Sequence, residues 1–166
     1  MITRYSRPEM RAIWTDENKL RLWLQIELLA SEALVKEGVV PRADFSKIKR
    51  GAGKWFNDLP GLVARQKELE KTLNHDVIGF TTAVAGKIHD NASRWFHFGL
   101  TSSDIIDTAF AVQMVQSADI LIQDVRAVRA SIAKQARQYK FTPSIGRSHG
   151  IHAEPTTFGL KLALMY

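Results

Sequence analysis

The sequence predicts an all-α fold with two parts, an N-terminal helical domain over residues 1–100 and the first part of a long central helical bundle over residues 101–166. Apolar residues recur at spacings of three and four through most of the chain, which is the period of an amphipathic helix. One such stretch runs on for far longer than a typical helix. No segment shows the convincing alternation of apolar and polar residues that a half-buried strand requires.

The first long helix is predicted over residues 16–38. Its apolar residues form one stripe along the helix. Thr15 or Asp16 can cap the start, and Gly38 followed by Pro41 ends the pattern. This stripe predicts a helix that buries one face against the rest of the domain.

Three further helices are predicted in the first part of the chain. Residues 44–50 form a short helix, which the glycine-rich run at 51–53 is expected to break. Residues 62–73 are polar-rich and predict a helix with an exposed face. Residues 76–89 are apolar and rich in small residues, which predicts a buried helix.

The longest pattern begins at Ser102, with apolar residues recurring from Ile105 to Ala136. Neither proline nor glycine interrupts it before Pro143. The predicted helix greatly exceeds the usual mean of about 11 to 12 residues. A helix of this length needs partner helices, so we expect a bundle. Without those partners, its exposed apolar stripe should drive self-association.

The last residues, 155–166, resemble the beginning of another helix, with Pro155 near its first turn. The chain stops inside this apolar pattern. We interpret the sequence as one that ends before the protein is complete.

Composition places the chain among ordinary globular proteins, with 45% hydrophobic and 24% charged residues. The absence of cysteine excludes a disulfide framework and a thiolate metal site. No apolar run approaches the roughly 18 residues that span a bilayer, and no signal peptide precedes the first helix. A cytoplasmic location is therefore expected.

The net charge of +6 favours anionic partners, either nucleic acid or a phosphorylated metabolite. Nucleic-acid modules usually combine a basic stripe with exposed aromatic residues. Here the basic residues are scattered and the tryptophans lie inside helical patterns. The charge alone does not choose between these partners.

Two segments near helix starts contain candidate binding groups. Arg4 could hold a phosphate through its planar guanidinium, or it could be a solvated residue at a frayed terminus. Thr101 and Ser102 lie where a loop becomes the long helix. Hydroxyls and unpaired N–H groups at such a terminus bind anions, although Thr101 and Asp104 also fit a capping box. His75 opens an earlier helix.

A third segment, residues 146–159, combines two histidines, a glutamate, glycines and a proline between two predicted helices. Histidine exchanges protons near neutral pH, so this segment is interpreted as a catalytic loop. The spacing of His149 and His152 would suit two metal ligands. A zinc site also needs a third protein ligand, and no helical HExxH spacing is present, so no metal is predicted.

These segments together resemble the adenylosuccinate lyase family of the fumarase/aspartase superfamily. The resemblance covers the whole chain and rests on residues 4–6, 74–77, 99–109 and 146–159. Members are all-helical homotetramers whose active sites each gather segments from three subunits. The resemblance implies β-elimination of fumarate from adenylosuccinate, giving AMP, and from succinyl-aminoimidazole-carboxamide ribotide. It implies no metal, no organic cofactor, and no nucleic-acid or membrane partner.

The resemblance also assigns roles to single residues. His149 becomes the general acid, and His75 takes a supporting role near the substrate phosphate or that acid. The implied substrate-binding residues are Arg4, Tyr5, Asn74, Asp76, Thr101 and Ser102. Ser148 stands where the family commonly has threonine and keeps the hydroxyl, whereas Asn74 stands where arginine is common and removes a possible phosphate contact. The family's base is a serine on a downstream glycine-rich loop absent from this sequence, so the chain alone is expected to be inactive.

Two alternatives remain open at this point. One is a sibling enzyme, such as argininosuccinate lyase or the carboxymuconate cycloisomerase. The other is a non-catalytic helical module that binds nucleotides or nucleic acid. Arg4 and Tyr5, together with residues 152–159, favour the purine enzyme over its siblings.

Overall fold

The computed structural model describes residues 2–166, which fall into two compact units, Met1–Gln116 and Ser117–Tyr166. The boundary between the units lies inside helix α6 (Ser102–Gln138), so this helix belongs to both. The domain boundary predicted after residue 100 stays a prediction.

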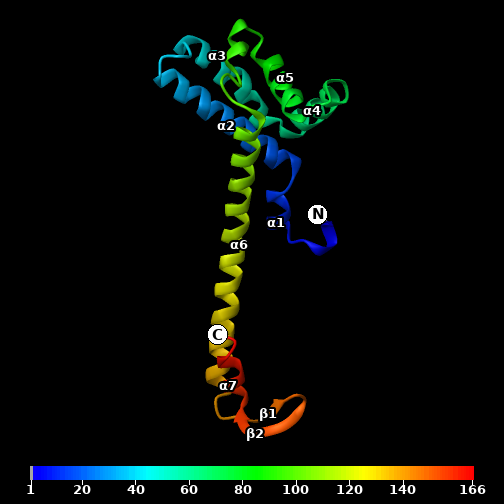
Figure 1. Ribbon diagram of the computed structural model, residues 1–166, viewed down its shortest axis with the longest axis vertical. Coiled ribbons are helices and arrows are strands. Elements are labelled where there is room, and N and C mark those ends of the chain that lie inside the picture. Colours follow the sequence, from blue (N-terminus) through cyan, green and yellow to red (C-terminus); the bar gives the residue numbers. More distant parts are fainter. Residues whose placement is uncertain (1) are drawn as a thin grey trace. The chain divides into compact units, whose positions relative to one another are not determined.

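The first unit is helical (Figure 1). Before α6 it contains α1 (Pro8–Ile13), α2 (Asp16–Lys36), α3 (Arg42–Gly53), α4 (Leu59–Leu73) and α5 (Asp76–Ile88), and the short 3-10 helices η1 (Thr3–Tyr5), η2 (Lys54–Asn57) and η3 (Asn91–Trp95). The helices predicted from periodicity are all present. The cap at Thr15 is also confirmed, because its side-chain oxygen accepts a hydrogen bond of 3.1 Å from the backbone N–H of Asn18.

The glycine run at 51–53 does not break α3, so that prediction was wrong. Gly51 is buried, and a Cβ atom there would lie 2.7 Å from Cα of Ile88 on α5. The missing side chain allows the two helices to approach closely. Packing between helices has therefore outweighed the weak intrinsic helix propensity of glycine.

One hydrophobic core holds the first unit together. Phe80 of α5 lies near its centre, with its ring 5.5 Å from that of Trp23 on α2 and 6.2 Å from that of Phe96. Ile105 and Ala109 place the first turns of α6 against the same core. The start of α6, which matters for the candidate site, is thus anchored by packing.

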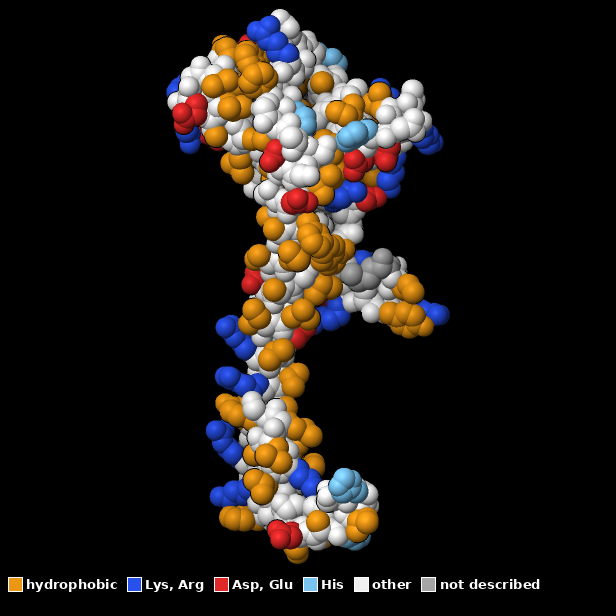
Figure 2. Space-filling view, in the orientation of Figure 1, with side chains coloured by type: hydrophobic (Ala, Val, Ile, Leu, Met, Phe, Trp, Pro, Cys, Tyr) orange, Lys and Arg blue, Asp and Glu red, His pale blue; other side chains and the backbone are white. Residues whose placement is uncertain are grey.

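Most of α6 is exposed in this chain. Its buried residues are Ile105, Ala109 and Gln113. Figure 2 shows hydrophobic side chains along the helix, and its exposed large apolar residues are Phe110, Val112, Met114, Val115, Leu121, Ile122, Val125 and Val128. By length and composition α6 could also cross a membrane, with a mean hydropathy of 1.4 in its most apolar window. Core helices of bundles pass the same test, so this finding alone is weak evidence for a membrane.

The second unit contains a β-hairpin that periodicity did not predict. Strands β1 (Pro143–Ser148) and β2 (Ile151–Thr157) pair antiparallel, from Pro143 opposite Thr157 to Ser148 opposite Ile151. Residues 146–159 were expected to be a loop, and Pro155 was expected in the first turn of a helix. Pro155 lies instead in β2, opposite Ile145. The mainly helical architecture is confirmed, and the strands are the exception to it.

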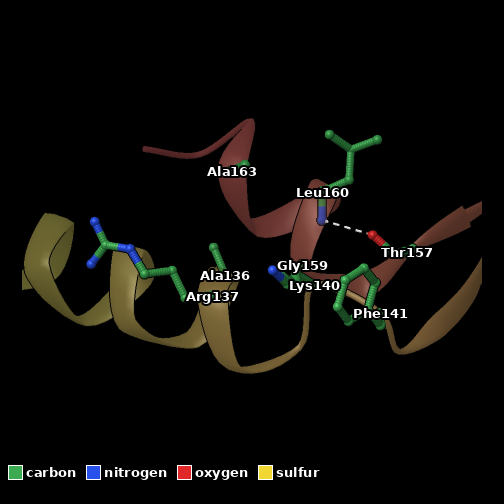
Figure 3. Close-up of a pocket in the computed structure, with 8 residues that line it drawn as sticks. All are labelled: Ala136, Arg137, Lys140, Phe141, Thr157, Gly159, Leu160 and Ala163. Carbon is green, nitrogen blue, oxygen red and sulfur yellow. Dashed lines mark hydrogen bonds between the residues drawn. The ribbon is translucent and has the colours of Figure 1, made fainter.

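Helix α7 (Phe158–Ala163) follows the hairpin and packs on the end of α6 (Figure 3). The backbone N–H of Gly159 donates to the carbonyl of Tyr139 over 2.9 Å. A Cβ atom at Gly159 would clash with Cα of Lys140 and lie 2.5 Å from the carbonyl oxygen of Ala136. Glycine is required here because the two backbones approach so closely, and this contact fixes the base of the hairpin.

Candidate active site

The first candidate group lies in the 3-10 turn η1. Arg4 and Tyr5 are both exposed, and the guanidinium carbon of Arg4 lies 4.7 Å from the centre of the Tyr5 ring. This distance fits a cation–π contact, which orients a guanidinium without consuming its N–H donors. Both side chains can therefore meet a ligand.

The second group lies at the junction of α4 and α5. Asn74 ends α4 in a left-handed conformation, with φ of 52°, and its N–H donates to the carbonyl of Glu70 over 2.8 Å. Asparagine tolerates this conformation better than most residues. Asn74 therefore has a structural role as a helix cap, whether or not it touches a substrate.

His75 is the N-cap residue of α5. Its Nδ1 lies 3.4 Å from the N–H of Ile78 and 3.5 Å from Oδ1 of Asp76. The two contacts need different protonation states. Neutral Nδ1 accepts from Ile78 and leaves the proton on Nε2, whereas a protonated Nδ1 faces the Asp76 carboxylate. Because both side chains are almost half exposed, the imidazole of His75 is accessible to a ligand, and its Nε2–H can donate when Nδ1 is the acceptor of the Ile78 N–H.

The third group is the start of α6. Oδ2 of Asp104 accepts hydrogen bonds from the backbone N–H of Thr101 over 2.7 Å and from its hydroxyl over 3.0 Å. These bonds, the backbone one first, lower the pKa of the Asp104 carboxyl. The capping contact that the sequence suggested is confirmed. The first N–H groups of α6, beginning at Ser102, still lack acceptors within the helix, and such a terminus attracts anions.

His149 occupies the turn of the hairpin in the second unit. His149 and Gly150 both have positive φ, of 51° and 76°, which is the signature of a two-residue type I′ turn. Glycine suits the second position because it has no Cβ to strain there. The turn leaves His149 exposed at the tip of the hairpin, where its imidazole is open to a ligand.

His152 lies on β2 opposite Arg147, and its Nε2 is 3.3 Å from Nη2 of Arg147. Arginine can only donate, so Nε2 of His152 accepts this hydrogen bond and is not free to give a proton. An open cavity of about 640 Å³ lies between the hairpin and α7, and its lining includes Arg147, Glu154 and Lys161. The hairpin thus carries the exposed imidazole of His149 and the imidazole of His152, which is hydrogen-bonded to Arg147. The cavity between the hairpin and α7 is lined in part by cationic side chains.

The predicted site residues are divided between the two units. The first unit holds Arg4, Tyr5, Asn74, His75, Asp76, Thr101 and Ser102, and the second holds His149. Among residues 2–166, no group of three or more histidine, cysteine or acidic side chains has the arrangement of a metal site.

Sequence reasoning missed one pair of residues, Glu27 and His97. Glu27 has no exposed surface, and its Oε1 lies 2.6 Å from Nδ1 of His97. Burial raises the pKa of the Glu27 carboxyl, an effect that the hydrogen bond to His97 opposes. A signal was present in the sequence, because a glutamate falls inside the apolar stripe of the first long helix. A charged residue at a core position needs a partner.

A model of the lyase family matches residues 3–166, nearly the whole chain. The chain belongs to this lyase family. Curated relatives include the adenylosuccinate lyases of Bacillus subtilis and Streptococcus mutans, each 46% identical over 166 residues. Both alignments cover 100% of this chain and 37% of the relative, so the chain spans little more than a third of their length.

Several solved structures share the fold. A fumarate lyase from Mesorhizobium sp. BNC1 has a TM-score of 0.85 at 24% identity and covers 96% of this chain and 38% of its own. A 3-carboxy-cis,cis-muconate lactonizing enzyme from Pseudomonas putida has a TM-score of 0.80 at 28% identity, covering 96% and 36%. These similarities confirm the predicted architecture.

Proposed function

We propose that this chain supplies part of the active site of an adenylosuccinate lyase. The enzyme would release fumarate from adenylosuccinate, giving AMP, and from succinyl-aminoimidazole-carboxamide ribotide. The observation that carries the proposal is the 46% identity to two adenylosuccinate lyases along all 166 residues. The muconate enzyme, a sibling by fold, is 28% identical. The higher identity favours the purine reaction over its relatives.

The proposed reaction is a β-elimination. A base removes a proton from the carbon next to a carboxylate, and the released electron pair forms the double bond of fumarate as the C–N bond breaks. The departing nitrogen then takes a proton from an acid. We assign the acid to His149, because an imidazole exchanges protons near neutral pH and this one is exposed at a defined turn. His75 has a supporting role near the general acid or near the phosphate of the substrate.

The remaining candidate residues suit a substrate with one phosphate and two carboxylates. Arg4 has its guanidinium donors free of its stacking contact with Tyr5, and the N-terminus of α6 offers N–H groups beside Thr101 and Ser102. Asn74 and Asp76 complete the proposed binding set through the α4–α5 junction. The net charge of +6 adds long-range attraction for such an anion.

We also propose that the exposed apolar side chains of α6 are covered by other helices in a homotetramer. These side chains alternate with charged ones in the second half of the helix, including Asp119, Asp124, Arg126 and Arg129. Such charges are typical of a helix with one solvent-exposed face and one packed face, and they are costly in a helix surrounded by lipid. A cytoplasmic enzyme follows from this assignment.

A chimaera tests the activity directly. Residues 1–166 replace the aligned 37% of the B. subtilis relative, and fumarate release is measured with adenylosuccinate, argininosuccinate and carboxymuconate as separate substrates. We expect activity with adenylosuccinate only. Activity with a sibling substrate instead would reassign the enzyme. Steeply salt-dependent RNA binding by the chain, with no binding of AMP, would favour the non-catalytic module.

A further inference from the structure

A hydrogen-bonded pair of titratable side chains, one of them buried, connects α2 to the segment that leads into α6. Glu27 is fully buried, with Oε1 2.6 Å from Nδ1 of His97. Its other oxygen, Oε2, has no hydrogen-bond partner within residues 2–166. Burying a carboxylate that is only half satisfied destabilises a fold, and an apolar side chain of similar size avoids that cost. Stability therefore does not explain the choice of glutamate here.

The backbone at His97 is held in an unusual conformation. Its φ is 67°, in the left-handed region, and Gly99 follows with φ of 75°. Non-glycine residues avoid this region by about 1–2 kcal/mol, so surrounding contacts must hold His97 there. The short hydrogen bond to Glu27 is such a contact.

Neighbouring residues anchor the same segment to the core. The indole N–H of Trp95 donates to Oδ2 of Asp44 over 3.0 Å, and Phe96 is buried. The backbone then reverses through His97 towards the start of α6. Of these three anchors, only His97 uses a group that can gain or lose a proton near neutral pH.

The segment ends at the proposed substrate-binding hydroxyls. Asp104 receives both hydrogen bonds from Thr101, and the charge of His97 adds a smaller effect that also lowers the pKa of the Asp104 carboxyl. His97 precedes Thr101 by four residues, so holding its ring against Glu27 also constrains the short segment that leads into the first turn of α6.

We propose that Glu27 is a positioning residue that acts through His97 on the Thr101–Ser102 binding groups. By holding Nδ1, it fixes the orientation of the ring. The side chain of His97 keeps 18% exposure, so part of it is accessible. A carboxylate at Nδ1 favours a proton on that nitrogen, which fixes the tautomer as well as the orientation of the ring. The inference rests on the proposed function for the identity of the substrate bound beside Thr101 and Ser102.

The first test uses the 166-residue chain and needs no activity. Imidazole ¹⁵N chemical shifts report which ring nitrogens carry protons, and His97→Gln identifies the resonances of His97. We expect a protonated Nδ1 in the wild-type chain. Replacing Glu27 with glutamine, or with methionine of similar length, should weaken the preference for a proton on Nδ1 of His97. Glu32→Gln, a control on α2, should change nothing. A wild-type His97 that is neutral with its proton on Nε2 would overturn the proposal.

The second test separates positioning from general stability in the chimaera. Glu27→Gln should raise KM about tenfold, the size expected when one hydrogen bond is misplaced, with a smaller change in kcat. Leu24→Ala, a core truncation on the same helix, should lower the Tm but leave KM unchanged. In the double variant, Glu27→Gln should not raise KM beyond the value already reached with His97→Gln, because both substitutions act through one contact. Unchanged KM, or additive effects, would refute the role. An inactive parent chimaera would count against the proposed function and leave the ¹⁵N result standing.

Discussion

Replacing His149 should remove the proton transfer and leave the fold intact. The side chain is exposed at the hairpin tip, so His149→Gln creates no cavity, and surface changes of this kind usually alter stability by less than about 0.5 kcal/mol. Loss of a general acid typically lowers the rate by about 100-fold or more. At 1.36 kcal/mol for each factor of ten, this is about 2.7 kcal/mol of transition-state stabilisation. Binding should change much less, since the proposed phosphate contacts lie on other residues.

The turn itself provides a matched control. The left-handed φ of 51° at His149 favours asparagine among non-glycine residues, and Asn–Gly is a preferred pair for type I′ turns. His149→Asn should therefore keep the hairpin at least as well formed as the wild type. If His149→Gln loses activity because it distorts the turn, His149→Asn should restore that activity. If the activity is lost because the proton donor is missing, both variants should have the same low kcat.

His152→Gln sets the comparison for the other histidine. Its hydrogen bond to Arg147 is 3.3 Å long and exposed, and one such bond contributes about 0.5–1.5 kcal/mol, which is roughly tenfold at most. The assay measures fumarate release in the chimaera, with kcat and substrate binding recorded separately for each variant. If His152→Gln abolishes turnover while His149→Gln reacts normally, the acid has been assigned to the wrong residue.

Three other predictions concern stability and assembly. Gly51→Ala should destabilise the first unit by about 1–3 kcal/mol in denaturant titrations because its Cβ meets α5, whereas Gly53→Ala, with open space around it, should be neutral or stabilising. The hydrogen bond from Lys67 lowers the pKa of the Asp16 carboxyl below 3.8, so it stabilises the fold above that pH and the effect fades as pH falls further. Asp16→Asn should consequently cost less than about 1 kcal/mol at pH 7, a difference from wild type that disappears in acid. The chain should self-associate in light scattering, and Val125→Lys should shift it towards monomer; a wild-type monomer would contradict this.

Local sequence patterns were sufficient for most of the helices. The apolar period predicted α2 and α6, and a composition rich in small apolar residues predicted α5. The capping residues Thr15 and Thr101 marked the starts of α2 and α6. These features depend on neighbours within a few residues, which is the range over which helix propensity and capping act. The resemblance of four short segments likewise indicated the family.

The hairpin at 143–157 depended on information that periodicity lacks. Its strands are largely exposed, so no buried face imposes alternation on their residues. The backbone pairing and the positive φ at His149 and Gly150 define it instead. The histidine–glycine pair was interpreted from the sequence only as part of a catalytic loop, and the turn emerged from the structure.

The sequence by itself determined the helical class, the family and the identity of the candidate groups, because each is expressed in short runs of residues. Tertiary structure alone decided which of those groups have partners. It let Gly51 continue a helix through close packing, paired His152 with Arg147, and joined Glu27 to His97 across 70 residues of sequence. Glu27 and His97 lie so far apart in the chain that they meet only when folding brings them together. The contacts of Gly51 and His152 likewise depend on which helices pack and which strands pair, and no local pattern encodes this.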